Sequence, residues 1–244
     1  MAMDMKQMAV DLEGLLRLST HPVGVRLCEE TKDLSGERIP AAKVSLCQMV
    51  KGAAQGGWRL ACPKEQMGCF TAQMILGFRE PGEKDVEHHQ KQFVKDGEVA
   101  RSLMEIKPKL SVGAIAGVLV GPLGDFEPHL MILLVNAHQA LGLIEAFAYS
   151  RGEALPFTNG VSSAVCSYGV VYVHQTQKPN LTVPCVGSKR YGLMQDHELI
   201  FSFPFTLVEG MLENMKEMEG AKKFPIPIVS GFLSPTIPVN YLVK

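Results

Sequence analysis

The sequence predicts an α+β protein, in which a mixed β-sheet is covered by helices. Two continuous apolar stretches, residues 114–120 and 129–135, have the composition of central strands buried on both faces of a sheet. Amphipathic segments surround them; in residues 5–17, for example, Met8, Leu12 and Leu16 recur at helical spacing. A chain of 244 residues can bury a large core, so we expect a single domain, 1–244.

The first part of the chain alternates between helical and strand-like segments. Ser45 is a good N-cap for a helix that Gly56-Gly57 terminates, and Pro63 prevents the next strand from continuing inside a sheet. We expect helices at residues 5–17, 45–55, 69–76 and 99–106, strands at 23–28 and 58–62, a loop at 29–43 and a polar, partly helical surface segment at 79–96.

The second part continues the two buried strands with further helices and strands. Asn136 can cap the helix that follows the strand at 129–135. We expect helices at residues 136–147, 160–174 and 205–218, strands at 181–185 and 198–203, and a glycine loop at 187–192. The last residues, 223–244, are apolar and rich in proline, so we expect them to pack in extended form on the body or on a second subunit of a homodimer.

Composition argues against several classes of function. The chain carries 24 Lys and Arg against 25 Asp and Glu, without a basic patch, so nucleic acid and anionic membranes are not expected partners. Its apolar runs are shorter than the ~18 residues of a membrane span, and the N-terminus lacks a signal-peptide core. We therefore expect a cytoplasmic protein whose six cysteines are free, metal-bound or catalytic rather than disulfide-bonded.

Two stretches of the chain, residues 44–78 and 165–195, echo each other. Each has a cysteine on a predicted helix, a polar or Gly/Pro break, a short apolar strand and a cysteine at the end of that strand. The echo is inexact, since the two cysteines are 15 residues apart in the first stretch and 19 in the second. We interpret it as a sign of duplication, with halves 1–110 and 111–222 that share one sheet.

The cysteines are the main candidates for chemistry. Cys69 lies at a predicted helix start and Cys185 precedes two cations, and both environments favour a thiolate, so these are the candidate nucleophiles. Thiolates also bind soft metals and iron–sulfur clusters. There is no CxxC pair, so an iron–sulfur or zinc site requires the fold to bring distant cysteines together; the candidate ligands are Cys47, Cys62, Cys69, Cys166 and Cys185.

Several cysteines and histidines also have a purely structural interpretation. Cys47 and Cys166 lie within predicted helices among apolar neighbours, where a cysteine is often a small buried hydrophobic residue, as we also expect for Cys28. His88 and His89 fall in a charged segment and are expected on a solvated surface.

The sequence GSKRYG, residues 187–192, is the best candidate for binding an anion. Gly187 and Ser188 can expose backbone N–H groups in a turn, while Lys189 and Arg190 supply positive charge. Arg190 can bind a carboxylate or phosphate through two parallel hydrogen bonds. The alternative is a basic surface turn in which Arg190 pairs with Asp196 or Glu198.

Several of these motifs resemble a family known only as domain of unknown function 169, found in archaea and anaerobic bacteria. The resemblance covers most of the chain. It rests on the opening helix followed by PVGV, on SLCQMVKGAA, on the helix after Cys69 with Gly77, on AVC at 164–166 and on LTVPC followed by GSKRYG. The family implies an architecture and a site that includes Cys47, Cys69, Cys166, Cys185 and Arg190; it implies no reaction.

Three hypotheses of function follow. The first is a ligand- or metal-binding, redox-linked protein whose cysteine site meets the GSKRYG loop. The second is a cysteine-dependent enzyme that acts on a small anionic substrate, with Arg190 as its anchor and Cys69 or Cys185 as nucleophile. The third is an interaction protein in which the cysteines are purely structural.

Overall fold

The computed structural model describes residues 4–221 and confirms the α+β class. The helices are α1 (Met5–Leu16), α2 (Leu46–Gly56), α3 (Phe70–Ile75), α4 (Glu83–Gln92), α5 (Gly97–Ile106), α6 (Ala137–Tyr149), α7 (Tyr172–Thr176), α8 (Val186–Arg190) and α9 (Val208–Gly220). The π-helix η3 (Ala164–Val171) runs directly into α7, and short 3₁₀ turns are η1 (Thr31–Leu34), η2 (Lys64–Gln66) and η4 (Phe205–Leu207). No helix in the described part of the chain is both long and apolar enough to cross a bilayer.

Six strands form one sheet in the order β2-β3-β1-β4-β6-β5. They are β1 (Val23–Cys28), β2 (Leu60–Pro63), β3 (Gly117–Pro122), β4 (Leu130–Val135), β5 (Asn180–Thr182) and β6 (Leu199–Pro204). The six strands pair antiparallel throughout, so the expectation of a mixed sheet is wrong in this detail. β2 ends at Pro63 and lies at an edge, as the missing N–H of proline requires.

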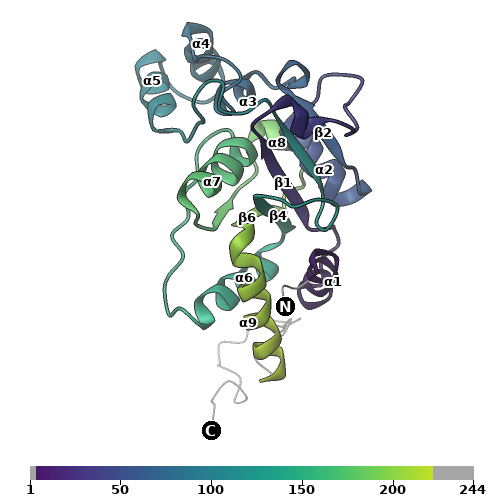
Figure 1. Ribbon diagram of the computed structural model, residues 1–244. Helices are drawn as coiled ribbons and strands as arrows, with labels where there is room; N and C mark the ends of the chain where they lie inside the picture. The colour runs from purple at the N-terminus through teal and green to yellow at the C-terminus, as the bar shows by residue number, and fades with distance from the viewer. Residues whose placement is uncertain (1–3, 222–244) are drawn as a thin grey trace.

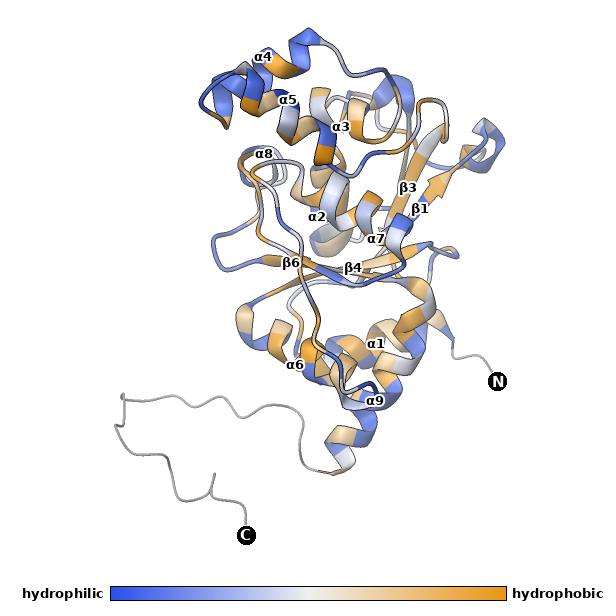
Figure 2. Cartoon of the chain, turned by 90° about the vertical axis from the view of Figure 1, so that its left-hand side faces the viewer, coloured by the Kyte–Doolittle hydropathy of each residue, from blue (hydrophilic) through white to orange (hydrophobic). Residues whose placement is uncertain are grey.

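Helices cover both faces of the sheet, as Figures 1 and 2 show. One face packs against α2, α3 and η3, and the other against α1, α6 and α9. Successive side chains of β4 therefore alternate between two cores: Leu130 and Ile132 belong to the first, Met131 and Leu133 to the second. This two-sided burial explains why β4 is apolar at every position and why β3 carries no polar side chain.

Local capping chemistry sets the start of two helices, as predicted. Ser45 accepts a hydrogen bond from the Gln48 N–H and the Gln48 side chain accepts one from Ser45, a reciprocal capping box that starts α2. Asn136 and Gln139 form the same arrangement at the start of α6. Gly57 ends α2 in the left-handed conformation.

The strand order is symmetric about the central β1–β4 pair. β2 and β5 are the two edges, and β3 and β6 lie next to them, so β1, β2 and β3 match β4, β5 and β6 in chain order. A duplication produces this arrangement when its boundary falls between β3 and β4, which is later than the boundary at 110/111 expected from the sequence. The duplication itself stays a prediction, and the tail, 223–244, lies outside the described residues.

Gly77 holds the end of α3 close to the segment that leads into β3. Its φ is +70°, and a Cβ there would lie 2.2 Å from the carbonyl oxygen of Ser111. We expect Gly77→Ala to lower the free energy of unfolding by more than about 3 kcal/mol, because a left-handed penalty of roughly 1–2 kcal/mol adds to a backbone collision. Gly36, with φ of +78° and open space around it, is the matched control, and Gly36→Ala should lose only about 1–2 kcal/mol. Urea denaturation of both variants measures the difference, and equal losses would mean that Ser111 moves aside.

Candidate functional site

A pocket of about 490 Å³ opens where α2, α3, η3 and α8 meet on one face of the sheet. Four of the six cysteines line it: Cys47, Cys69, Cys166 and Cys185. These four come from four different segments, so the fold gathers residues that are up to 138 positions apart, from 47 to 185. The fold thus brings distant cysteines together, which is the condition that a cysteine site must meet.

Each of the four cysteines has a defined place in its element. Cys47 lies in the first turn of α2 and Cys166 lies within η3, and these two helices pack against each other. Cys69 is the N-cap of α3 and Cys185 is the N-cap of α8, where the first backbone N–H groups of a helix have no partner in the helix. The two helix interiors and two helix starts thus direct their sulfurs to one pocket.

The other two cysteines lie elsewhere. Cys28 is fully buried in a small cluster behind β1 and β3, as expected for a structural cysteine. Cys62 is also fully buried, and burial raises the pKa of its thiol to about 12. It does not line the pocket, so the fold does not bring this candidate ligand together with the other four. The reason is that Cys62 belongs to the paired part of β2, which holds its side chain within the core.

Cys185 is the cysteine of the pocket that the structure favours as a thiolate. Burial acts to raise the pKa of this thiol, but hydrogen bonds from the Ser188 side chain and from the backbone of Ala164, Ser188 and Ser163 outweigh burial and lower it. Ser163 has a φ of +66°, an uncommon left-handed conformation for a residue other than glycine. Consecutive N–H groups in such a turn form a concave anion site, here aimed at the sulfur.

Ser188 links two of the sulfurs. Its Oγ lies 3.3 Å from the Cys185 sulfur and 3.5 Å from the Cys47 sulfur. Burial, and then the neighbouring Cys185, raise the pKa of the Cys47 thiol to about 12, so Cys47 stays protonated and can donate to Ser188. The Ser188 hydroxyl can then donate to the Cys185 sulfur, so Cys47, Ser188 and Cys185 form a hydrogen-bonded chain.

The remaining two thiols of the pocket are held protonated. Burial raises the pKa of Cys69, and the hydrogen bonds from the N–H groups of Ala72 and Thr71 do not outweigh it. The expectation that the helix start makes Cys69 a thiolate is therefore wrong in the free protein. Burial also raises the pKa of Cys166 well above its usual range, and the three neighbouring thiols add to this effect.

The GSKRYG segment differs from the expected glycine loop. Residues 186–190 form the short helix α8, so Gly187 is helical rather than part of an exposed turn. Gly192 has the tighter position, because a Cβ there would lie 2.9 Å from the Cβ of Cys47. This close approach brings the end of α8 next to the start of α2.

The basic residues of this segment have separate roles. Arg190 is exposed, lines the pocket and makes no ion pair within residues 4–221. Lys189 does not line the pocket and pairs with Asp196 at 2.5 Å instead. Glu198 is bound by the buried Lys51, and no ion pair joins Arg190 to Asp196 or Glu198, so that alternative is wrong. Arg190, Gly187 and the buried Ser188 thus remain beside the pocket.

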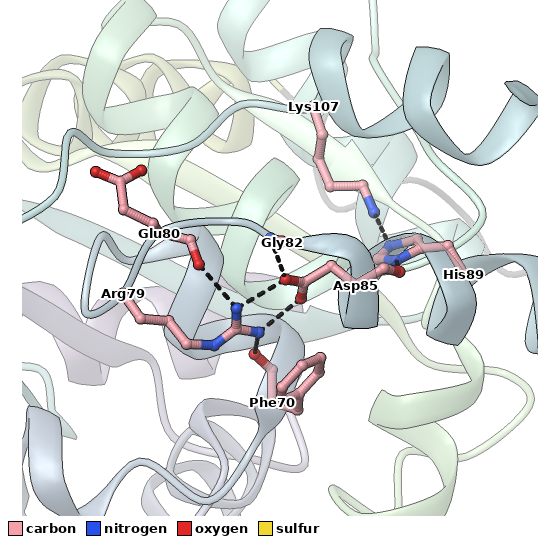
Figure 3. Close-up of polar contacts among 7 residues, drawn as sticks. All are labelled: Phe70, Arg79, Glu80, Gly82, Asp85, His89 and Lys107. Carbon is pink, nitrogen blue, oxygen red and sulfur yellow. Dashed lines mark hydrogen bonds and ion pairs between the residues drawn. The ribbon is translucent and has the colours of Figure 1, made fainter. Parts of the chain in front are cut away.

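Figure 3 shows a group of polar side chains that the sequence did not reveal, and this group contacts the wall of the pocket. Lys107 is buried and its Nζ lies 2.9 Å from Nε2 of His89 and 2.7 Å from Oγ of Ser162, which lines the pocket. His89 is fully buried, so the expectation of a surface histidine is wrong. The spacing of Asp85, Val86 and His89 on one face of α4 was the available signal, and no local pattern marks Lys107.

The arrangement of the sulfurs decides what they could hold. Among residues 4–221, no group of three or more His, Cys, Asp and Glu side chains stands in a position to hold a single metal ion. The four sulfurs surround a cavity rather than a point. An iron–sulfur cluster shares its four cysteines among two or four irons, so its ligands stand further apart than those of a single zinc ion.

Comparison with known proteins identifies a family and adds no activity. A family model, domain of unknown function 169 (DUF169), described as "Uncharacterised ArCR", matches residues 11–214. The chain is similar to the uncharacterized protein MJ0308 of Methanocaldococcus jannaschii, at 25% identity over 224 residues, which cover 86% of this chain and 93% of that protein. No solved structure matches the chain. From the match over most of its length, the chain belongs to the family of domain of unknown function 169.

Proposed function

We propose that the protein holds an iron–sulfur cluster in this pocket and acts as a redox-linked, ligand-binding protein. One observation carries the proposal: Cys47, Cys69, Cys166 and Cys185 come from four separate segments and line the same pocket. The remaining two cysteines, which serve as buried apolar residues, are outside it. Four cysteine thiolates are the usual ligand set of both [2Fe–2S] and [4Fe–4S] clusters.

The surroundings suit a cluster better than zinc. The described side chains do not converge on a single metal position, whereas a cavity between the sulfurs has room for a larger group. Hydrogen bonds to ligand sulfurs and the exclusion of water tune the reduction potential of iron–sulfur centres. Here the Ser188 hydroxyl and the backbone N–H groups of Ser163 and Ala164 would supply hydrogen bonds to Cys185.

A second candidate is a cysteine-dependent enzyme that acts on a small anionic substrate without a metal. It is favoured by the lowered pKa of Cys185, because a thiolate is the nucleophilic form of cysteine. In that case Cys185 rather than Cys69 is the nucleophile, and Arg190 at the pocket holds the substrate. The third hypothesis, purely structural cysteines, fits Cys28 and Cys62 but does not account for four cysteines around a cavity.

The proposal also extends to location and assembly. The six cysteines are unpaired, which fits the reducing conditions of the cytoplasm, so we propose a cytoplasmic protein. A homodimer built on residues 223–244 also remains a proposal, because that segment lies outside the described residues.

Anaerobic purification followed by analysis of iron, zinc and acid-labile sulfide tests the proposal. We expect iron and sulfide in equal amounts, with a visible absorbance that dithionite bleaches. Zinc without sulfide would replace the cluster by a single-metal site and contradict the proposal. A metal-free protein in which one thiol reacts much faster than the others, mapped to Cys185 by peptide mass, would support the enzyme instead.

A further inference from the structure

Lys107 is a buried cation without a carboxylate partner in the described part of the chain. Only 2% of its surface is exposed, and its Nζ contacts Ser162 and His89. A buried ammonium group is expensive to maintain unless an anion compensates it. The source of that compensation is therefore informative about what the site binds.

The carboxylate of Asp85, in the same group of polar side chains, does not compensate the charge of Lys107. Asp85 accepts two hydrogen bonds from Arg79, at 2.6 and 2.7 Å, and one from the N–H of Gly82, so its charge is already matched (Figure 3). His89 contacts the carbonyl oxygen of Asp85 through Nδ1, at 2.8 Å, so Nδ1 carries the hydrogen and Nε2 accepts from Lys107. The imidazole is thus neutral and adds no negative charge.

The pocket is the other neighbour of Lys107. Ser162 and Ser163 both line it, and their hydroxyl oxygens are 3.4 Å apart, so the hydrogen bonds of Lys107 lead from its ammonium group to the pocket wall. Burial lowers the pKa of Lys107 to about 8. The positive charge of the nearby Lys109 also lowers the pKa of Lys107. The charge of Lys107 is thus available to an anion in the pocket.

Arg190 adds a second free cation at the exposed side of the same pocket. Its guanidinium has no ion pair within the described residues; Asp196 pairs with Lys189, and Glu198 pairs with Lys51. A guanidinium presents planar pairs of donors that match carboxylates and other oxyanions. The exposed guanidinium of Arg190 therefore lines the cavity of the thiols, and the buried ammonium group of Lys107 contacts Ser162 in its wall.

We propose that the four-cysteine pocket is a binding site for a small oxyanion or carboxylate, charged from within by Lys107 and at its mouth by Arg190. The inference rests on the proposed function in that it names the ligand class of the same pocket, but it does not require a metal. An anion bound in this pocket lies next to the sulfurs, where a redox centre or a thiolate would act on the anion.

The test compares an anionic and a neutral alkylating reagent on the full-length protein, reduced and treated with a chelator, at one fixed pH. Iodoacetate and iodoacetamide react with a thiolate in the same way, with displacement of iodide, and differ in the carboxylate that the pocket would attract. We measure the ratio of their rates at Cys185 by peptide mass. Arg190→Gln should lower this ratio by roughly threefold or more, since a charged cleft raises the local concentration of an oppositely charged reagent.

Matched controls separate the pocket from general surface charge. Lys189→Gln removes a neighbouring cation that pairs with Asp196 and should leave the ratio unchanged. Lys107→Met should lower the ratio, whereas Lys109→Met, which removes a lysine bound to the carbonyl oxygens of Met104 and Glu105, should not. If Lys107→Met fails to fold, as circular dichroism would show, the comparison of Arg190→Gln with Lys189→Gln decides.

An unchanged ratio in Arg190→Gln, or an equal fall in both Arg190→Gln and Lys189→Gln, would overturn the inference. The outcome is independent of the iron and sulfide analysis. A protein without iron can still show the anionic preference, and an iron-containing protein can lack it, so failure of one proposal is distinguishable from failure of the other.

Discussion

Cys166→Ala is expected to abolish the retention of iron and sulfide by the anaerobically purified protein. Cys166 lies within η3 and lines the pocket together with the other three cysteines. Removing one of four thiolates leaves one iron of a cluster without its protein ligand. Iron and sulfide per chain, together with the visible absorbance, measure the effect. Alanine is small enough to keep η3 packed, so the variant should remain folded.

Cys62→Ala is the matched control for this substitution. Cys62 is as deeply buried as Cys166 and its loss removes the same sulfur atom from a core, but it lies outside the pocket. We expect Cys62→Ala to lose some stability and keep its full iron content. Equal loss of iron in both variants would indicate that destabilisation, and not ligand removal, explains the result, and the four-cysteine site would be wrong.

Glu198→Gln is expected to lower the free energy of unfolding by about 3–5 kcal/mol, the usual range for breaking a buried ion pair from one side. The Nζ of Lys51 lies 2.5 and 2.6 Å from the two carboxylate oxygens of Glu198, and both residues are buried. Glu198 also accepts the N–H of Gln195 at 2.7 Å. Without the carboxylate charge, the ammonium group of Lys51 stays buried and uncompensated. Urea denaturation gives the change in stability.

This pair also matters for the site. Lys51 lies one helical turn after Cys47 on α2, and Glu198 follows the segment that carries Cys185 and Arg190. Asp196, two positions before Glu198, is the control. Asp196→Asn breaks the exposed ion pair with Lys189 and should leave the unfolding midpoint unchanged. A similarly small change in Glu198→Gln would show that water reaches the pair and that it does not hold the segment to α2.

Local sequence patterns predicted the elements well where their physical cause is local. Strand β1 has the bounds 23–28 expected from alternation, and β4 agrees with the apolar run at 129–135. Ser45 and Asn136 start α2 and α6 through hydrogen bonds to residues three positions later, so neighbouring residues are sufficient to predict them. The segment 79–96 was harder, because α4 is polar overall and buries one face that contains Asp85 and His89.

The pKa values of the two helix-capping cysteines are a property that local sequence patterns do not predict. Cys69 and Cys185 both cap a helix start, and the sequence assigns the same tendency to each. In the structure the pKa of Cys69 is raised by burial, whereas Cys185 gains donors from Ser163 and Ala164, which are more than 20 positions away. The difference depends on the balance between burial and distant hydrogen bonds, which adjacent residues do not specify.

By itself, the sequence determined the α+β class, the helix caps, the end of β2 at Pro63 and the cysteines worth testing. These features depend on side-chain periodicity and on contacts within a few residues. Only the tertiary structure decided that Cys166 joins the pocket while Cys62 does not, and that Lys107 contacts its wall. Those outcomes depend on how α2, α3, η3 and α8 pack on one face of the sheet, because residues far apart in the chain meet only through that packing.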